Sequence, residues 1–366
     1  MRNLIGVDTS VIDTPALVID IDVMEANIAK MASFFRDRPA NLRPHTKTPK
    51  TPAIAWKQIE AGAIGITCAK LGEAEVMADA GIRDILIANQ VVAPEKIERL
   101  MEVAKRSDVI VAVDSQKNID DLAKAARATG VDLKILVEVD IGMHRCGIDP
   151  GEPAVELTQH VCRSEGLRFV GVMGYEGHLV MTVNEEERRT TCREAMGLLT
   201  WTADEITRSG IDVEIVSGGG TGTYKITGAY PGVTEVQAGS YVFNDGRYRT
   251  VEGVGSDFGC ALTLLTTVIS RPKPDLAVID AGMKAITKEF GLPQVVGLDG
   301  SELFHLSEEH GRITLNGTAQ DLKIGDKIEL LPSHGCTTIN LHDRFYGVRH
   351  GKVEVMWPIE ARGKCQ

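Results

Sequence analysis

The fold can be traced outward from one stretch of eight residues, Arg43-Pro44-His45-Thr46-Lys47-Thr48-Pro49-Lys50. The extended segment 41–43 leads into it, and a helical pattern begins after Pro52. Lys47 is therefore predicted to lie at or just past the carboxyl end of a strand. In folds built from parallel strands, the loops at that end converge on one mouth and carry the chemistry. A lone loop lysine is usually only solvated, so the role of Lys47 depends on what accompanies it.

Short apolar segments recur along the chain, and most of them precede a stretch with helical spacing. The predicted strands are eight: 41–43, 65–69, 85–88, 109–113, 134–140, 169–173, 213–216 and 234–238. They are continuously apolar, as strands buried on both faces must be. Eight such units in about 200 to 250 residues predict an α/β fold, a TIM-type (β/α)8 barrel. A doubly wound open sheet is the alternative, because the segment 224–232 is short for the last crossover helix.

The pattern changes beyond about residue 251, where β-rich segments alternate with Gly, Pro, Asp and Asn turns. These segments are 261–270, 276–280, 313–315, 327–331 and 352–357. We therefore expect a barrel domain over residues 14–250, which includes a strand at 16–20 and a helix at 23–35. A C-terminal all-β domain is expected over residues 251–366, joined by residues 1–13.

Composition narrows the classes of function. The net charge of -11, with no long basic run to offset it, argues against nucleic-acid and membrane-surface partners. No apolar run approaches the ~20 residues of a membrane span, and residues 1–8 lack the features of a signal peptide. Seven scattered cysteines, an odd number, indicate reduced thiols and a cytoplasmic protein.

Unusual polar clusters follow four more of the predicted barrel strands. Arg145 lies between glycines after the fifth strand, and Tyr175 and His178 follow the sixth. The seventh strand runs into the glycine-rich stretch 217–223, and the eighth into residues 239–241. Because all of these follow carboxyl ends, they are expected to surround one mouth with Lys47. Loops after the seventh and eighth barrel strands commonly cradle phosphate, since bare backbone N–H groups can approach an anion there.

Each cluster alone has an ordinary structural explanation. A glycine-rich loop is often only a tight connection, Arg145 could be an ion-pair partner, and His178 could be a hydrogen-bonded interior histidine. Taken together, they form the set that a pyridoxal phosphate site requires. A lysine faces a phosphate cradle, with an arginine, a tyrosine and a histidine between them.

A second constellation lies near the carboxyl end, where His334 and Cys336 stand two residues apart. In an extended segment this spacing turns both side chains to one side, where they can share a metal ion. Two protein ligands completed by water suit a catalytic metal, with Zn²⁺ favoured by the thiolate and Mn²⁺ or Mg²⁺ as the other choices. The structural alternative is a buried cysteine beside a turn. His342 and Asp343 are additional candidate ligands.

These motifs together resemble the D-threonine aldolase and D-serine dehydratase family, within the alanine racemase-like, fold-type III group of pyridoxal phosphate enzymes. The resemblance covers nearly the whole chain. It rests on the ordered set Pro44-His45-Thr46-Lys47, 142–147, 218–224, 237–243, His334-Gly335-Cys336 and Trp357-Pro358.

The resemblance implies roles for individual residues. Lys47 would be the Schiff-base lysine, and Arg145 would contact the phenolic oxygen of the cofactor. His178, or else His45, would be the catalytic base, and His334 and Cys336 would bind a divalent metal near the substrate's β-hydroxyl. The full predicted cofactor-binding set is Lys47, Arg145, Tyr175, Ser217, Gly219, Gly220, Thr221, Gly239, Ser240 and Tyr241.

The implied reaction is a retro-aldol cleavage of D-threonine-like substrates to glycine and an aldehyde, by a homodimeric, metal-dependent lyase. A D-serine or D-3-hydroxyaspartate dehydratase is the alternative. Cys336 looks more like the dehydratases, because the aldolases favour an aspartate there, whereas 338–343, 347–349 and 218–224 look more like the aldolases. An amino-acid racemase would need a second base, for which Tyr346 is available. A non-catalytic pyridoxal phosphate-binding protein is disfavoured by the second domain.

Overall fold

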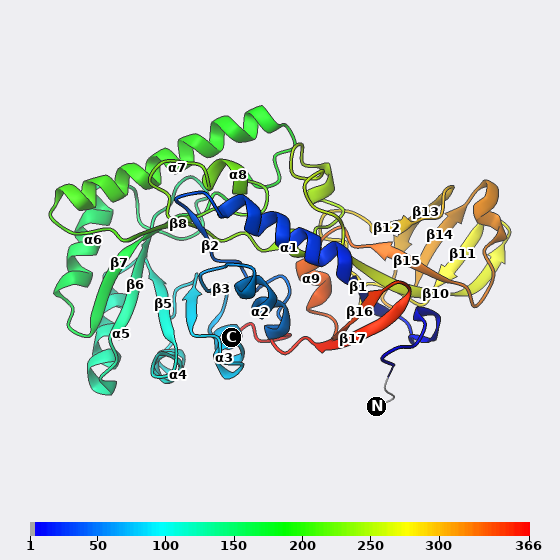
Figure 1. The fold of residues 1–366 in the computed structure, drawn as a ribbon, viewed down its shortest axis with the longest axis horizontal. Helices are drawn as coiled ribbons and strands as arrows, with labels where there is room; N and C mark the ends of the chain where they lie inside the picture. The colour runs from blue at the N-terminus through cyan, green and yellow to red at the C-terminus, as the bar shows by residue number, and fades with distance from the viewer. Residues whose placement is uncertain (1–3) are drawn as a thin grey trace. The chain divides into compact units, whose positions relative to one another are not determined.

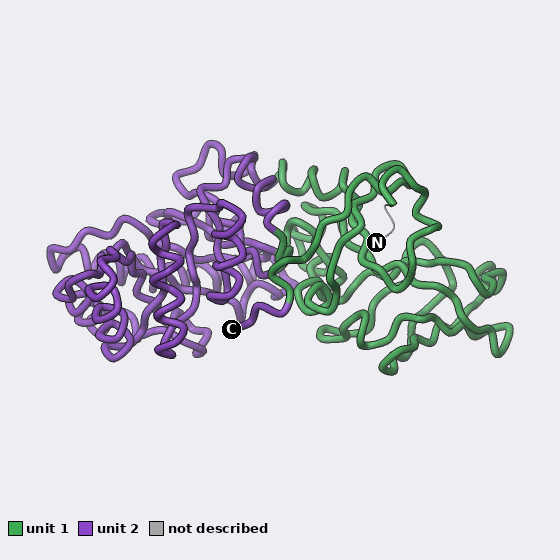
Figure 2. The backbone as a smooth tube through the Cα atoms, turned by 90° about the horizontal axis from the view of Figure 1, so that it is seen from below, with its two compact units in different colours: residues 1–30, 48–51, 240–362 green, residues 31–47, 52–239, 363–366 purple. Residues whose placement is uncertain are grey.

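The computed structural model describes residues 4–366, which separate into two compact units (Figure 2). Unit 1 comprises the described part of residues 1–30 together with 48–51 and 240–362. Unit 2 comprises residues 31–47, 52–239 and 363–366. The division differs from the expected one at 14–30, 48–51 and 240–250, which group with the β-rich unit, and at 363–366, which group with the barrel.

Unit 2 is built on eight parallel strands in the order β2-β9-β8-β7-β6-β5-β4-β3. The two ends of this order meet in a parallel bridge between His45 and Thr67, next to which the Thr46 N–H donates to the Thr67 carbonyl at 2.7 Å. The prediction of a TIM-type barrel is therefore confirmed. The strands are β2 (Asn41–Leu42), β3 (Ile66–Cys68), β4 (Asp84–Ile87), β5 (Asp108–Val113), β6 (Leu133–Glu138), β7 (Leu167–Met173), β8 (Ile215–Gly218) and β9 (Glu235–Val236).

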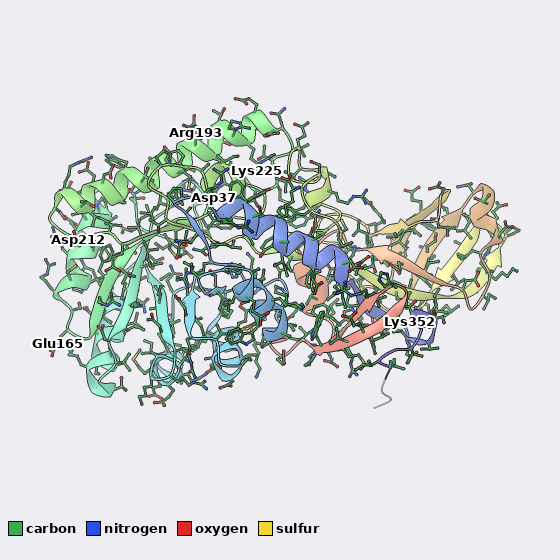
Figure 3. The ribbon with its side chains drawn as sticks, in the orientation of Figure 1. Asp37, Glu165, Arg193, Asp212, Lys225 and Lys352 are labelled. Carbon is green, nitrogen blue, oxygen red and sulfur yellow. The ribbon has the colours of Figure 1, made fainter. Side chains whose placement is uncertain are left out.

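Helices lie outside these strands, and charged side chains such as Glu165, Arg193 and Asp212 are exposed on the outer side (Figures 1 and 3). The strands bury an apolar core between them, which includes Leu86, Ile110, Leu136 and Val170. The helices are α2 (Pro52–Glu60), α3 (Leu71–Asp79), α4 (Pro94–Ala104), α5 (Gln116–Thr129), α6 (Glu152–Arg163), α7 (Glu185–Arg208) and α8 (Tyr224–Thr227).

Local sequence explains where these helices begin and end. In α5 the buried residues Ile119, Leu122, Ala123 and Ala126 recur at helical spacing, so one face of the helix packs on the strands. The helix ends at Gly130, whose φ of 69° is left-handed and favours glycine. The last crossover is as short as its sequence suggested, because α8 has only four residues.

Unit 1 holds a mostly antiparallel sheet in the order β13-β14-β11-β10-β1-β16-β17, with β15 paired to β10 and β12 paired to β15. Its strands are β1 (Ala16–Asp20), β10 (Leu262–Lys273), β11 (Leu276–Ile279), β12 (Gln294–Val296), β13 (Ser301–Leu306), β14 (Gly311–Leu315), β15 (Lys327–Leu331), β16 (Arg344–Arg349) and β17 (Lys352–Pro358). The separate β domain is thus confirmed as a fold class. The helix α1 (Ile21–Phe35) follows β1 and continues from unit 1 into unit 2.

The strand β1 explains why the units divide as they do. It pairs antiparallel with β10 and parallel with β16, so it lies inside the sheet of unit 1. Its residues Ala16 and Val18 pack in an apolar cluster with Leu265 and Val353. A strand that precedes the barrel in sequence therefore belongs to the other unit, and its composition alone could not reveal this.

Candidate active site

Lys47 lies in the turn that follows β2, and its ammonium group faces an aromatic ring. Its Nζ lies 5.7 Å from the ring centre of Tyr175, which follows β7. The guanidinium carbon of Arg145, in the loop after β6, lies 5.6 Å from the same ring centre. Both distances are within the range of cation–π contacts. Three of the predicted site residues, from three different strand ends, therefore meet around one ring.

The turn that carries Lys47 is fixed by its neighbours. The Lys47 N–H donates to Nδ1 of His45 at 3.4 Å, and the Thr46 hydroxyl donates to the Thr67 carbonyl at 2.9 Å. Gly239, at the end of the loop after β9, packs against His45 so closely that a Cβ there would lie 2.5 Å from the His45 carbonyl oxygen. His45, predicted as the second choice of base, thus turns one ring nitrogen toward the backbone of the lysine turn.

The glycine-rich loop after β8 reaches the same tyrosine. A Cβ at Gly220 would lie 3.4 Å from the Tyr175 hydroxyl, and a Cβ at Gly222 would collide with the Val180 carbonyl. Gly219 has a φ of 78°, which favours glycine. The loop is therefore bare backbone packed against Tyr175, and side chains at Gly220 and Gly222 would fill it. Such a loop suits a phosphate group, so the residues present fit pyridoxal phosphate.

Two amides of this loop already have partners. The Gly219 N–H donates to Oε2 of Glu176 at 3.1 Å, and the Gly220 N–H donates to the Thr223 hydroxyl at 3.1 Å. Glu176 lies between Tyr175 and His178, which were predicted to belong to the site, but no role was predicted for Glu176 itself.

The remaining predicted cofactor residues are buried. The Ser217 hydroxyl accepts a hydrogen bond from the Gln237 amide at 2.8 Å in unit 2. Ser240 and Tyr241 form the short 3-10 helix η2 (Ser240–Val242), which belongs to unit 1. The Tyr241 ring is fully buried there, 5.7 Å from the ring of Phe258 between centres.

His178 is exposed after β7, and its ring packs on the loop after β6. A Cβ at Gly142 would lie 3.4 Å from its Nε2. The first-choice base therefore lies beside the loop that carries Arg145, and not in the interior of the barrel.

An acidic group beneath that loop was not predicted. Glu138, at the end of β6, is buried and accepts from the Gln90 amide at 2.5 Å. Burial raises the pKa of Glu138, while the Gln90 hydrogen bond and the charge of Arg145 act in the opposite direction. The neighbouring Asp114 accepts from the Gly147 N–H at 3.1 Å and from the same Gln90 amide at 3.0 Å. These contacts tie the Arg145 loop to the strand ends.

The His334–Cys336 motif belongs to unit 1, and its conformation differs from the expected one. Residues Gly335–Ile339 form the short helix α9, so the segment is not extended through Cys336. His334 itself is extended and immediately precedes the helix. The two side chains nevertheless remain close enough for a hydrogen bond between them to act on the His334 pKa. The helical turn, and not strand alternation, brings them together.

Asp245 holds His334 in place, and the sequence analysis missed it. Its Oδ2 lies 2.9 Å from Nδ1 of His334 and accepts from the Gly335 N–H at 3.2 Å. Its Oδ1 accepts from the N–H groups of Arg247 and Tyr248 at 3.1 and 2.9 Å. A carboxylate that binds Nδ1 leaves Nε2 as the ligand atom, which is the usual arrangement around metal-binding histidines.

The side-chain types at this motif suit a divalent cation, which would have to displace the proton held by His334. Burial lowers the pKa of His334, but hydrogen bonds and charges from Asp245 and Cys336 raise it to about 10. The Cys336 sulfur lies 3.2 Å from the Thr48 hydroxyl. Within residues 4–366, no group of three or more His, Cys, Asp or Glu side chains is placed to hold a metal. The donor set therefore fits, at most, a site with two protein ligands and water.

The two additional candidate ligands make other contacts. Nε2 of His342 lies 2.7 Å from the Ala285 carbonyl, and Asp343 pairs with Arg362 at 3.2 Å.

Comparison with known proteins agrees with this geometry. Residues 19–246 match the family described as alanine racemase, N-terminal domain, and residues 261–348 match the putative serine dehydratase domain. The chain belongs to the D-threonine aldolase and D-serine dehydratase family. This family implies pyridoxal phosphate as the cofactor. No helix within residues 4–366 is both long and apolar enough to cross a membrane.

Members of this family differ in their similarity to the chain. A 3-hydroxy-D-aspartate aldolase of Paracoccus denitrificans is 39% identical, over 98% of this chain and 94% of its own length. The crystal structure of a D-threonine aldolase from Filomicrobium marinum is 37% identical with a TM-score of 0.97, and covers 100% of both chains. A D-threo-3-hydroxyaspartate dehydratase of Delftia is more distant, at 31% identity over 89% of this chain and 92% of its own.

Proposed function

We propose that this protein is a pyridoxal phosphate- and divalent metal-dependent lyase that cleaves D-β-hydroxy-α-amino acids to glycine and an aldehyde, as a D-threonine aldolase does. The observation that carries the proposal is the grouping of Lys47, Arg145 and the bare loop at Gly220 around Tyr175. Its aldolase character is supported by higher identity to aldolases than to the dehydratase.

The residues of the barrel mouth would hold the cofactor from several sides. Lys47 would bind it covalently through Nζ, Arg145 would pair with its phenolic oxygen, and the loop 217–223 would receive its phosphate. When bound, the cofactor supplies an electron sink for the carbanion that remains after the Cα–Cβ bond breaks. The Tyr175 ring lies within cation–π range of both Lys47 and Arg145.

His178 would take the proton from the substrate's β-hydroxyl at one of its ring nitrogens. Exposure at the mouth gives it access to a bound substrate, and contact with Gly142 limits the motion of its ring. A general base must come within hydrogen-bond reach of the proton that it removes. His45 is a weaker choice, because its Nδ1 faces the Lys47 amide.

His334 and Cys336 would hold the divalent metal, with Asp245 orienting the histidine. Bound to a hydroxyl oxygen, a divalent cation lowers the hydroxyl pKa and makes proton removal easier. A thiolate ligand favours Zn²⁺ over Mn²⁺ and Mg²⁺.

The alternatives differ in which bond breaks first. A dehydratase would remove the α-proton and release hydroxide, and Cys336 is the residue that favours this reaction. A racemase would need a second base, but the suggested Tyr346 packs against the apolar cluster of Ile12, Ala16 and Val353. Like the metal, a homodimer and a cytoplasmic location remain proposals from the family resemblance.

A product assay tests the proposal. Purified protein would be supplied with pyridoxal phosphate and Mn²⁺ or Zn²⁺, then with D-threonine or D-serine. Acetaldehyde and glycine from D-threonine are the expected products. Release of 2-oxobutyrate or pyruvate with ammonia would instead establish the dehydratase, and interconversion of enantiomers alone would establish a racemase.

A further inference from the structure

Glu176 is a fully buried carboxylate for which the proposed reaction has no use. It follows Tyr175 in the loop after β7, and its exposed fraction is 0%. Taking an ionised carboxylate out of water is unfavourable unless hydrogen-bond donors compensate it. The residues around Glu176 supply these donors, and most of them belong to the loop after β8 and to α8.

The carboxylate is surrounded by donors from the loop after β8 and from two helices. Oε2 accepts from the Gly219 N–H at 3.1 Å. Oε1 accepts from the hydroxyls of Thr223 and Thr227 at 2.7 and 2.6 Å, and more weakly from the Cys192 thiol at 3.8 Å. Hydrogen bonds to a charged acceptor are roughly twice as strong as neutral ones. Glu176 is therefore hydrogen-bonded to both ends of the segment 219–223, at Gly219 and Thr223, and also to Thr227 in α8.

The Thr223 hydroxyl connects Glu176 to the Gly220 amide in the centre of the loop through two hydrogen bonds. Because it donates its proton to Glu176, its oxygen is left to accept from the Gly220 N–H at 3.1 Å. The carboxylate thus determines the orientation of the Gly219 amide directly and of the Gly220 amide through one hydroxyl. No full helix follows β8 to supply this order, since α8 has only four residues.

We infer that Glu176 is a positioning residue for the phosphate end of the cofactor, and that the phosphate is not bound by the Gly219 amide, which already donates to Glu176. This inference rests on the proposed function, because it needs pyridoxal phosphate to be the ligand. A conformation set by Glu176 keeps the loop open for an anion before the anion arrives, which reduces the ordering required on binding.

The test compares two ligands that differ only in the phosphate. Apoprotein would be titrated with pyridoxal phosphate and with pyridoxal, following absorbance and protein fluorescence. Glu176→Gln keeps the size of the side chain but removes the charge and points an N–H₂ group at existing donors. We expect its affinity for pyridoxal phosphate to fall roughly 10- to 100-fold, with pyridoxal affinity within about twofold of wild type.

Two further variants keep the test decisive if Glu176→Gln folds poorly. Thr223→Val removes the hydroxyl that links Glu176 to Gly220, and should reproduce a selective loss for the phosphorylated ligand of roughly tenfold. Thr227→Val is the matched control, because it removes a donor that is outside the loop, and its loss should be clearly smaller.

Each outcome bears on one proposal or both. Equal weakening of both ligands, or unchanged preference for the phosphorylated one in Glu176→Gln and Thr223→Val, would overturn the role of Glu176 alone. A rise in pyridoxal phosphate affinity on removal of the charge would also overturn it. Wild-type protein that binds neither ligand would overturn the proposed function and this inference together.

Discussion

The barrel mouth of unit 2 and the His334 motif of unit 1 gather their residues in opposite ways. Around Tyr175, each contributor comes from a different strand end, and repetition of the strand–helix unit brings them together. Around His334, two residues come from one short segment and the third, Asp245, comes from a distant part of the sequence. The first site depends on the topology of a whole sheet, whereas the second depends on one helical turn and on the hydrogen bonds that Asp245 makes to it.

Their electrostatics differ as well. In the barrel, Lys47 and Arg145 face the ring of Tyr175. In unit 1, a buried carboxylate pairs with a histidine whose pKa is raised to about 10. The first arrangement leaves cationic groups for an anionic ligand, whereas in the second a metal ion would have to displace the proton that His334 holds. The two sites should therefore fail independently when residues are changed.

The largest effect is expected from Lys47→Ala. Loss of the covalent attachment point should reduce kcat by at least about 1,000-fold, because the bond to the cofactor would form at Nζ. The absorption of the bound cofactor should change, while metal affinity measured by equilibrium dialysis should not. Lys117→Ala is the control, since Lys117 is exposed on α5 and pairs only with Asp121 among the ion pairs of the described chain. Retained turnover in Lys47→Ala would break the assignment of the barrel site.

A smaller effect is expected from Asp245→Asn, and here metal binding should weaken while cofactor binding does not change. Asparagine can still accept from the N–H groups of Arg247 and Tyr248, but its amide would donate to Nδ1 of His334. The proton then moves to Nε2, which can no longer bind a metal. Affinity for Zn²⁺ or Mn²⁺ should fall about 10- to 100-fold, by calorimetry, with pyridoxal phosphate affinity unchanged. Equal metal affinity in both proteins would show that Asp245 does not orient a ligand.

The contrast also explains what the sequence could and could not predict. Lys47, Arg145 and Tyr175 could be assigned to one mouth because parallel strands put their carboxyl ends on one side. The same reasoning could not place β1, whose partners β10 and β16 lie hundreds of residues away. The same reasoning also missed β13 (Ser301–Leu306). Apolar and polar residues do not alternate regularly in this strand, and four of its six residues are not buried.

Within the sites, the missed residues are carboxylates whose partners are distant in sequence. Glu176 bonds to Thr223 and Thr227, and Asp245 to His334. The local sequence pattern cannot distinguish a buried carboxylate that accepts four hydrogen bonds from a carboxylate that is exposed to solvent. The short helix at Cys336 was missed for another reason: the spacing of two residues was interpreted as a strand, while the glycine at 335 and threonines after it form a turn of helix.

The next test exchanges the proposed metal ligand Cys336 and leaves His334 and its partner Asp245 unchanged. Cys336→Asp replaces a soft thiolate by a hard oxygen, so preference should move from Zn²⁺ toward Mn²⁺ or Mg²⁺. We expect the ratio of activities with Mn²⁺ and Zn²⁺ to rise roughly tenfold, with the aldehyde product retained. Unchanged metal dependence and activity would count against Cys336 as a ligand. Cys162→Ser, an exposed thiol on α6, is the control.

The smallest effect concerns the barrel mouth alone and is visible only in stability. Burial raises the pKa of Glu138 in the folded protein. A raised pKa means that folding favours the protonated carboxyl of Glu138. The stability that this protonated form contributes is fully present below the pKa of the unfolded state, and it is lost as pH rises through the pKa of the folded state. Above that range the buried carboxylate destabilises the native state.

Glu138→Gln keeps the oxygen that accepts from Gln90 and removes the charge, so its Tm at pH 8 should exceed that of wild type by roughly 1–3 °C. The difference should shrink toward pH 4 in thermal melts. A Tm that falls at pH 8 would show that attraction to Arg145 outweighs the cost of burial.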